Sequence, residues 1–229
     1  MLAAGPAPAA TARFEDSIAQ RTQVCVACHG KQGRAGPDGF YPRIAGKPAG
    51  YLYNQLLNFR EGRRHYGLMQ RLVDPLSDDF LREIAAHFAS IDLPYPAPPP
   101  STAPPALLAR GEQLARRGDK GLQLPACMQC HGEKLTGANP AVPGLLGLPI
   151  DYLNAQIGAW RTGERKAQPP DCMHTIAERL APADVTAVAS WLAAQPVPAD
   201  SHPEPRLPES MPLECGSAAG PVAAPKEPK

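Results

Sequence analysis

Two short motifs in this sequence combine residue types that could hold a redox cofactor. They follow the pattern Cys-x-x-Cys-His and consist of Cys25, Cys28 and His29 and of Cys127, Cys130 and His131. This pattern is the attachment signature of c-type haem. Two thiols three positions apart on a helical turn can reach the two vinyl groups of one porphyrin, and the adjacent histidine then faces the iron. The motifs therefore predict two covalently bound haems, with His29 and His131 as proximal iron ligands.

Paired cysteines also occur in two other kinds of site. A lone pair can be a redox-active dithiol, and two pairs can form a zinc ribbon. In this sequence a histidine directly follows both pairs, and each copy has a methionine at a matching position further along, Met69 and Met173. Zinc ribbons need no such methionine, so the pattern favours haem over zinc and over dithiol chemistry.

Met69 and Met173 are the expected distal ligands of the two irons. Core packing is the usual role of a methionine, but both of these lie in polar sequence at the same position of a repeat. A methionine in a loop ahead of the last helix would reach the opposite face of the haem, where its thioether stabilises Fe(II) and raises the reduction potential. His65 in the first copy, and Cys172 or His174 in the second, are alternative ligands.

The motifs belong to two copies of one larger unit. The segment Pro42–Gly46 matches Pro143–Gly147, and the segment that starts at Tyr51 matches the one that starts at Tyr152. Residues 94–105 lie between the copies, and seven of these twelve residues are proline. Such a segment cannot form a helix or a central strand, and it favours an extended, semi-rigid spacer.

The predicted fold class is all-α, with two tandem helical domains. We expect a first domain at 13–93, a proline-rich linker at 94–105, a second domain at 106–196 and a proline-rich tail at 197–229. Apolar residues recur at helical spacing in segments 14–27, 51–59, 79–90, 107–118, 151–162 and 182–194. Three short helices make a thin core, which a large cofactor would complete. The tail has few large apolar residues, so it is expected to be disordered or strapped along the domains.

Charge and hydropathy exclude two classes of partner. The formal net charge is only +1, which leaves no basic excess to neutralise nucleic acid. No apolar stretch is long enough to predict a membrane span. The first ten residues are small, like the end of a signal peptide, but they lack a basic region and a long apolar core. We interpret them as a truncated or processed export signal and expect a periplasmic location.

These features together resemble the dihaem cytochrome c4 family, in which two class I cytochrome c domains follow each other. The resemblance covers about 13–196. It is carried by the two attachment motifs, the two Pro-x-Ile/Leu-x-Gly segments, the two methionine loops, and the segment from Tyr51 to Arg64 with its match from Tyr152 to Arg165. It implies two cytochrome c-like domains whose haems meet near the domain interface, with their propionates facing inwards.

The resemblance also implies roles for residues around the haems. The carbonyls of Pro42 and Pro143 would accept hydrogen bonds from the Nδ1–H of the two ligand histidines, which fixes each ring and tunes its basicity. Arg60 and Arg161 are candidate partners of the propionates, with solvated surface arginines as the alternative.

Two cysteines are left over, Cys172 and Cys215. In an oxidising compartment such a pair often forms a disulfide, which would fix the tail beside the distal loop of the second haem. The competing hypothesis is that Cys172 replaces Met173 as iron ligand. That arrangement would resemble the catalytic haem of thiosulfate dehydrogenases.

The predicted function is single-electron transfer between periplasmic or membrane-bound redox partners, because two His/Met-ligated haems leave no position for a substrate. The donor would be a dehydrogenase or a quinol–cytochrome complex, and the acceptor a terminal oxidase or reductase. We therefore expect no enzyme activity. One alternative is the electron-accepting subunit of a periplasmic dehydrogenase. Another is a catalytic dihaem protein, such as a peroxidase or thiosulfate dehydrogenase, which would need one haem with an open or thiolate-ligated position.

Overall fold

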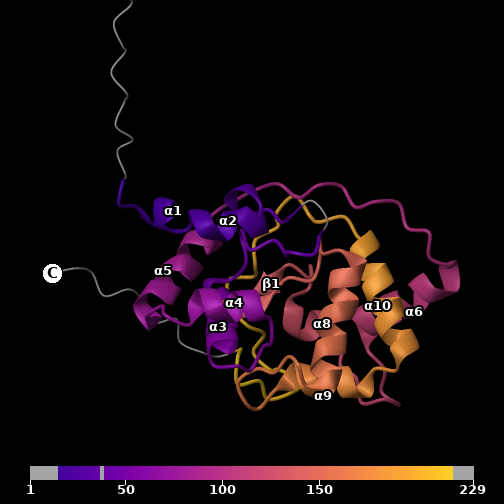
Figure 1. Ribbon diagram of the computed structural model, residues 1–229. Coiled ribbons are helices and arrows are strands. Elements are labelled where there is room, and N and C mark those ends of the chain that lie inside the picture. The colour runs from indigo at the N-terminus through magenta and orange to yellow at the C-terminus, as the bar shows by residue number, and fades with distance from the viewer. Residues whose placement is uncertain (1–14, 37–38, 219–229) are drawn as a thin grey trace, which may run out of the picture.

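The computed structural model describes residues 15–36 and 39–218 of the chain. Within these ranges the helices form a pair of groups that lie side by side, the first coloured indigo to magenta and the second mostly orange (Figure 1). This arrangement confirms the all-α class with two helical domains. The presumed export remnant at 1–10 and the end of the tail at 219–229 lie outside the described residues. Among the described residues, no helix has the length and apolar character needed to cross a bilayer.

The first half is built from short helices, two of which begin at a serine cap. They are α1 (Ile18–Arg21), α2 (Gln23–His29), α3 (Ala49–Arg60), α4 (Gly67–Val73) and α5 (Asp78–Ala89), with a 3-10 turn at Lys31–Gly33. At the start of α5, the Ser77 side chain accepts a hydrogen bond from the Phe80 N–H, and Asp78 and Asp79 occupy the first turn. Both features stabilise a helix N-terminus. The helix expected at 14–27 is interrupted at Thr22, which ends α1 and precedes α2.

The second half repeats this plan. Its elements are α6 (Pro105–Arg117), α7 (Met128–His131), α8 (Ile150–Thr162), α9 (Cys172–Arg179), α10 (Pro182–Ala194) and the short antiparallel strands β1 (Gly137–Ala138) and β2 (Val142–Pro143). Pro105 and Pro182 stand in the first turns of α6 and α10. A proline is favoured there because its missing N–H would have no helical partner and its fixed φ suits the helix.

The segments that carry the two candidate methionine ligands are helical, and the expectation of loops was wrong. Met69 lies on α4 and Met173 on α9. Helix α9 is initiated by Asp171, whose side chain accepts a hydrogen bond from the His174 N–H at 3.1 Å. Such a cap stabilises a helix too short for hydrophobic periodicity to reveal it.

Each half has its own apolar core. In the first half, Phe59 of α3 packs with Leu81 and Phe88 of α5. In the second half, Leu114 of α6 and Trp191 of α10 belong to one buried cluster. Two separate cores are what a duplicated domain requires, because each copy must bury the apolar faces of its own helices.

The two halves also pair through their backbones. The N–H of His65 donates to the carbonyl of Glu164 at 2.9 Å, and the N–H of Lys166 donates to the carbonyl of Arg63 at 2.6 Å. These bonds form an antiparallel bridge between matching segments of the repeat. The contact therefore relates the two copies by an approximate two-fold arrangement.

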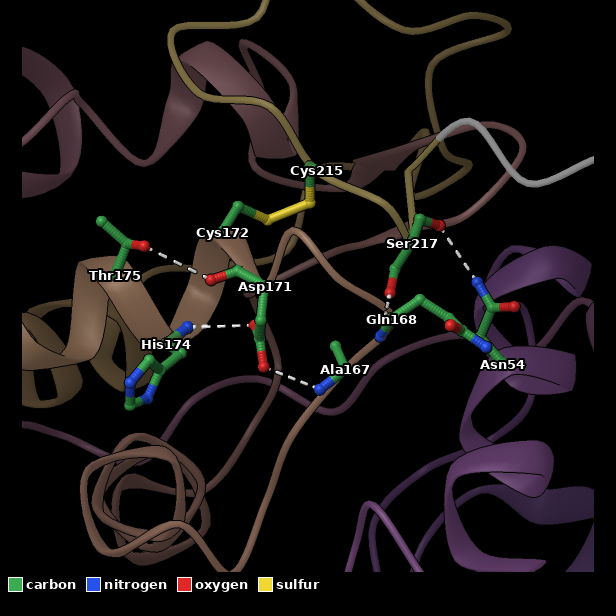
Figure 2. Close-up of a disulfide and its surroundings, with 9 residues drawn as sticks. All are labelled: Asn54, Ala167, Gln168, Asp171, Cys172, His174, Thr175, Cys215 and Ser217. Atoms are coloured by element: carbon green, nitrogen blue, oxygen red, sulfur yellow. Dashed lines mark hydrogen bonds between the residues drawn. A yellow bond between two sulfur atoms is a disulfide. The ribbon is translucent and has the colours of Figure 1, made fainter. Parts of the chain in front are cut away.

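The described residues of the tail, 197–218, are strapped to the molecule. Glu204 forms a parallel bridge with Ala138 of β1. Cys215 is disulfide-bonded to Cys172 of α9. Two residues further on, the carbonyl of Ser217 accepts a hydrogen bond from the side-chain amide of Asn54 in the first half, at 3.0 Å (Figure 2). The tail thus contacts both halves.

Helices α6 and α10 pack closely enough to require glycine at position 111. A Cβ atom there would lie 2.1 Å from the carbonyl oxygen of Ala187, which is a backbone atom that cannot turn away. We predict that Gly111→Ala lowers the free energy of unfolding by about 1–3 kcal/mol, as overpacking does. The exposed neighbour variant Glu112→Ala should change it by less than about 0.5 kcal/mol. Denaturant unfolding of the holoprotein measures both, and equal stabilities would contradict the close packing.

Candidate functional site: two haem-attachment half-sites

The two Cys-x-x-Cys-His motifs occupy helical turns, as predicted. Cys25, Cys28 and His29 lie on α2, and Cys130 and His131 on α7. Cys127 directly precedes α7 with helical backbone angles. The four motif cysteines are not disulfide-bonded, so all of their sulfur atoms are available for thioether bonds.

The surroundings of these thiols argue against dithiol and zinc chemistry. Burial raises the pKa of Cys127 to about 11, and it also raises the pKa values of Cys25 and Cys130. A reactive dithiol requires a lowered thiol pKa. Among the described residues, no three His, Cys, Asp or Glu side chains gather into a metal-binding cluster. The structure therefore does not bring the two motifs together, as a zinc ribbon would.

Each motif histidine is oriented by a proline carbonyl, in the same way in both halves. The Nδ1 atom of His29 lies 2.8 Å from the carbonyl oxygen of Pro42, and that of His131 lies 2.7 Å from the carbonyl oxygen of Pro143. A carbonyl can only accept, so Nδ1 carries the proton and Nε2 keeps its lone pair. Burial lowers the pKa of both imidazoles, which keeps them neutral. A neutral ring with a free Nε2 is the form that binds a metal.

The two methionines differ in their surroundings. Met69 packs against the core of the first half, in the cluster that also contains Cys25 and Tyr66. Met173 is half-buried on α9, and the apolar cluster around Cys127 does not include it. The structure thus brings the first methionine to its motif and leaves the second near the tail.

The alternative ligands have other contacts or surroundings in the structure. His174 has its Nδ1 atom 3.2 Å from the carbonyl of Trp160 and its Nε2 atom 3.3 Å from Glu178. His65 is exposed at the bridge between the two halves. Cys172 is bonded to Cys215, so it has no thiolate to offer an iron.

Arg60 and Arg161 have partners other than those predicted. Arg60 donates to the carbonyl of Leu76 at 2.8 Å and pairs with Asp78 at 2.5 Å. Arg161 donates to the carbonyl of Leu180, which matches Leu76 in the repeat. Both guanidinium groups therefore hold the turn ahead of the last helix of their domain, and their role at the haem propionates stays a prediction.

Two other arginines, Arg64 and Arg165, meet where the halves join. Both donate to the side-chain oxygens of Gln55 and Gln156, at distances from 2.7 to 3.0 Å. Gln55 and Gln156 match each other in the repeat, as do the two arginines. Sequence reasoning assigned these arginines no role. They occupy matching positions at the ends of two repeated segments, and this match could have indicated that they have a shared role.

This contact is rich in positive charge. Arg64 and Arg165 each donate to a tyrosine of the opposite half, Tyr152 at 3.3 Å and Tyr51 at 3.4 Å. Within the described ranges, the hydrogen-bond acceptors of both guanidinium groups are neutral oxygens. Burial would raise the pKa of Tyr51, but the charges of Arg165, Arg64 and Lys47 lower it. Burial and the charge of Arg64 also lower the pKa of Arg165. The positive charge gathered at this contact favours the binding of anions.

Buried donors without acceptors lie in the same region. The indole N–H of Trp160 and one guanidinium nitrogen of Arg63 have no hydrogen-bond partner among the described residues. The guanidinium carbon of Arg165 lies 3.9 Å from the centre of the Trp160 ring. A buried donor is costly when it stays unpaired. The carboxylates of haem propionates would supply both acceptors and negative charge, so the residues present fit the predicted cofactor.

Comparison with known proteins agrees with this geometry. The thiosulfate dehydrogenase electron acceptor of Thiomonas intermedia is 41% identical over 174 residues, which are 76% of this chain and 79% of that protein. Cytochrome c4 of Pseudomonas aeruginosa is 34% identical over 174 residues, 75% of this chain and 84% of its own. The crystal structure of reduced cytochrome c4 from Pseudomonas stutzeri superposes with a TM-score of 0.65 at 32% identity, over 76% of this chain and 94% of that one. No family profile matches the chain.

Two helical domains, each with a Cys-x-x-Cys-His turn and a carbonyl-bound histidine, define a dihaem c-type cytochrome. The similarity to cytochromes c4 in sequence and in structure makes the assignment specific. The chain belongs to the dihaem cytochrome c4 family. It carries two covalently bound haem c groups and transfers electrons.

The arginine contact between the halves should contribute to stability. We predict that Arg165→Met lowers the free energy of unfolding of the holoprotein by about 1.5–3 kcal/mol, because charge-assisted hydrogen bonds to Gln55 and Gln156 are lost. Arg116→Met, at a half-exposed arginine of α6, should cost less than about 1 kcal/mol. Thermal or denaturant unfolding compares the two. Equal losses would mean that Arg165 does not hold the halves together.

Proposed function

We propose that this chain accepts electrons from a periplasmic dehydrogenase and passes them through its two haems to a respiratory acceptor, without catalysing a reaction of its own. The observation that carries the proposal is the buried contact around Arg64 and Arg165. Hydrogen bonds across this contact hold the two half-sites in one fixed pair. An electron that enters one half therefore has a second redox site within the same molecule.

The axial ligands proposed for the first iron are His29 and Met69, and those for the second are His131 and Met173. Bound haem supplies a one-electron iron couple. The protein anchors it through the thioethers of Cys25, Cys28, Cys127 and Cys130. With a nitrogen and a sulfur ligand on each iron, no coordination position is left for a substrate. This closed ligand set is what an electron carrier needs.

The disulfide supports this assignment at the second site. A catalytic haem with a thiolate ligand would require Cys172 as a free thiolate, but its sulfur is bonded to Cys215. Met173 is then the remaining sulfur ligand on α9. The carbonyl of Pro143 binds Nδ1 of His131 as that of Pro42 binds Nδ1 of His29. The second site thus has no free thiolate from Cys172, which favours a carrier over a catalytic dihaem enzyme with a thiolate-ligated iron.

The relatives indicate the class of donor. The protein of Thiomonas intermedia, 41% identical to this chain, is named for accepting electrons from thiosulfate dehydrogenase. We therefore take a periplasmic thiosulfate dehydrogenase as the donor of this chain. An exported chain with covalent haem and a disulfide fits that compartment, because disulfides persist in the periplasm.

The methionine assignment predicts a spectroscopic effect. Replacement of Met69 or Met173 by alanine should each remove about half of the Met-to-Fe(III) charge-transfer absorption of the oxidised holoprotein and lower the potential of one haem. Met128→Leu is the matched control, because Met128 packs in the core of the second half and should leave the absorption intact. A single variant that retained the full absorption would show that the iron concerned has another ligand.

The donor assignment predicts a direct reaction. Oxidised holoprotein should be reduced when thiosulfate and purified thiosulfate dehydrogenase are both present, and it should stay oxidised when either is omitted. The reduction is followed by the haem absorption of this chain. If a quinol–cytochrome complex reduced the chain and the dehydrogenase did not, the chain would be a carrier with a different donor.

A further inference from the structure

The segment that leads to Met173 is longer than its match in the first half. From Arg64 to Met69 the chain advances by five residues, and from the matching Arg165 to Met173 it advances by eight. The additional residues fall in the stretch 166–171, directly before α9. The entropic cost of fixing a connection rises with its length, so the second methionine is held less firmly by its own segment than the first.

The two methionines also differ in their packing. Met69 packs against the buried core of the first half, in the cluster that contains Cys25. Met173 belongs to none of the buried apolar clusters formed by the described residues. Close packing is what normally fixes a side chain in one place. The position of Met173 therefore needs a different constraint.

The tail supplies such a constraint through three consecutive residues, which we refer to as the tail clamp. Each residue of the tail clamp binds a different residue of the segment before Met173. Cys215 is disulfide-bonded to Cys172, the N–H of Gly216 donates to the carbonyl of Pro170 at 3.0 Å, and the hydroxyl of Ser217 accepts from the N–H of Gln168 at 3.2 Å. Figure 2 shows Cys215 and Ser217 beside this segment.

The tail clamp fits closely against the backbone of the segment. A Cβ atom at Gly216 would lie 2.2 Å from the carbonyl oxygen of Pro169 and 2.8 Å from that of Gln168. Both oxygens are backbone atoms, which cannot turn away as the end of a side chain can. Any larger residue at this position would therefore push the tail and the segment apart.

The clamped segment determines where α9 begins. The side chain of Asp171 accepts hydrogen bonds from the N–H of Ala167 at 2.7 Å and from the N–H of His174 at 3.1 Å. These bonds join the segment to the first turn of α9, which contains Met173. A constraint on residues 168–172 is therefore also a constraint on the backbone of Met173.

The tail clamp is itself anchored to both halves of the molecule. The carbonyl of Ser217 accepts a hydrogen bond at 3.0 Å from the side-chain amide of Asn54, on α3 of the first half. Ala218, the next residue, is 3% exposed and packs with Val142 of β2 in the second half. The tail clamp therefore holds the methionine segment against fixed parts of the structure.

We infer that the tail clamp positions Met173 as the distal ligand of the second iron, and that ligation of the second haem depends on the tail whereas ligation of the first does not. The inference rests on the proposed function for the identity of the ligand. A methionine on a free segment must be ordered each time it binds, and a segment that is already held avoids most of that entropic cost. Met69 needs no such device because core packing holds it.

Competition with imidazole tests the inference on the oxidised holoprotein. Imidazole displaces a methionine ligand from Fe(III), and the loss of the Met-to-Fe(III) absorption reports the displacement. In the double variant Cys172→Ser/Cys215→Ser, the imidazole concentration that displaces half of the second methionine should fall by about tenfold. The concentration for the first haem should stay unchanged. The variants Met69→Ala and Met173→Ala assign each phase of the titration to its haem.

A second variant tests the tail clamp with the disulfide in place. Gly216→Ala retains both cysteines, and its Cβ should displace the tail from the segment, so the second methionine should again yield to less imidazole. This variant decides the question if the double serine variant does not fold. The matched control is Ser210→Ala, at an exposed tail residue outside the tail clamp, and it should titrate like the wild type.

The potential of each haem is the companion measurement, because a weakened methionine ligand lowers the potential of its own iron. Only the second haem should change. If both tail-clamp variants titrate like the wild type while Met173→Ala removes the second absorption, the inference is wrong and the proposed ligation stands. If Met173→Ala leaves the absorption intact, the ligation and the inference fail together. Equal changes at both haems would reduce the tail clamp to general stabilisation, which also contradicts the inference.

Discussion

The hydrogen bond between a motif histidine and a proline carbonyl is the interaction on which each half of this protein depends. It fixes the tautomer, because the carbonyl oxygen of Pro42 or Pro143 can only accept. It also leaves Nε2 with its lone pair, as the nitrogen that would bind the haem iron. The thioethers would anchor the haem, and the carbonyl would fix the orientation of the imidazole that binds its iron. Helices α3 and α5, and α8 and α10, then build a core around that arrangement.

The contact between the halves joins the two half-sites. Arg64 and Arg165 share Gln55 and Gln156, so each half completes the hydrogen bonding of the other. The excess of buried positive charge at this place needs anions, and haem propionates would provide them. The approximate symmetry ends at the surface, where the tail packs on the β1–β2 hairpin of the second half.

Much of the site could be predicted because its chemistry depends on short spacing. Cys25, Cys28 and His29 must be close in sequence to meet one porphyrin, and the proline follows the histidine by 13 residues in the first copy and 12 in the second. The arginines could not be assigned in the same way. Arg60 ends α3 and Arg64 lies four residues further on, and only the folded contacts decide which one binds the turn ahead of α5 and which one meets the other half. The path of the tail could not be predicted from its composition either. It is set by the disulfide between Cys215 and Cys172. Helices α4 and α9 were missed because they are short and depend on tertiary contacts and capping.

The central claim is that one chain holds two equivalent His/Met haem sites that exchange single electrons. Potentiometric titration of the holoprotein, followed through the Met-to-Fe(III) absorption, tests it most directly. The account predicts two one-electron steps, each accompanied by a partial loss of that absorption as its iron is reduced. A step that left the absorption unchanged, or a titration with one electron in total, would contradict it.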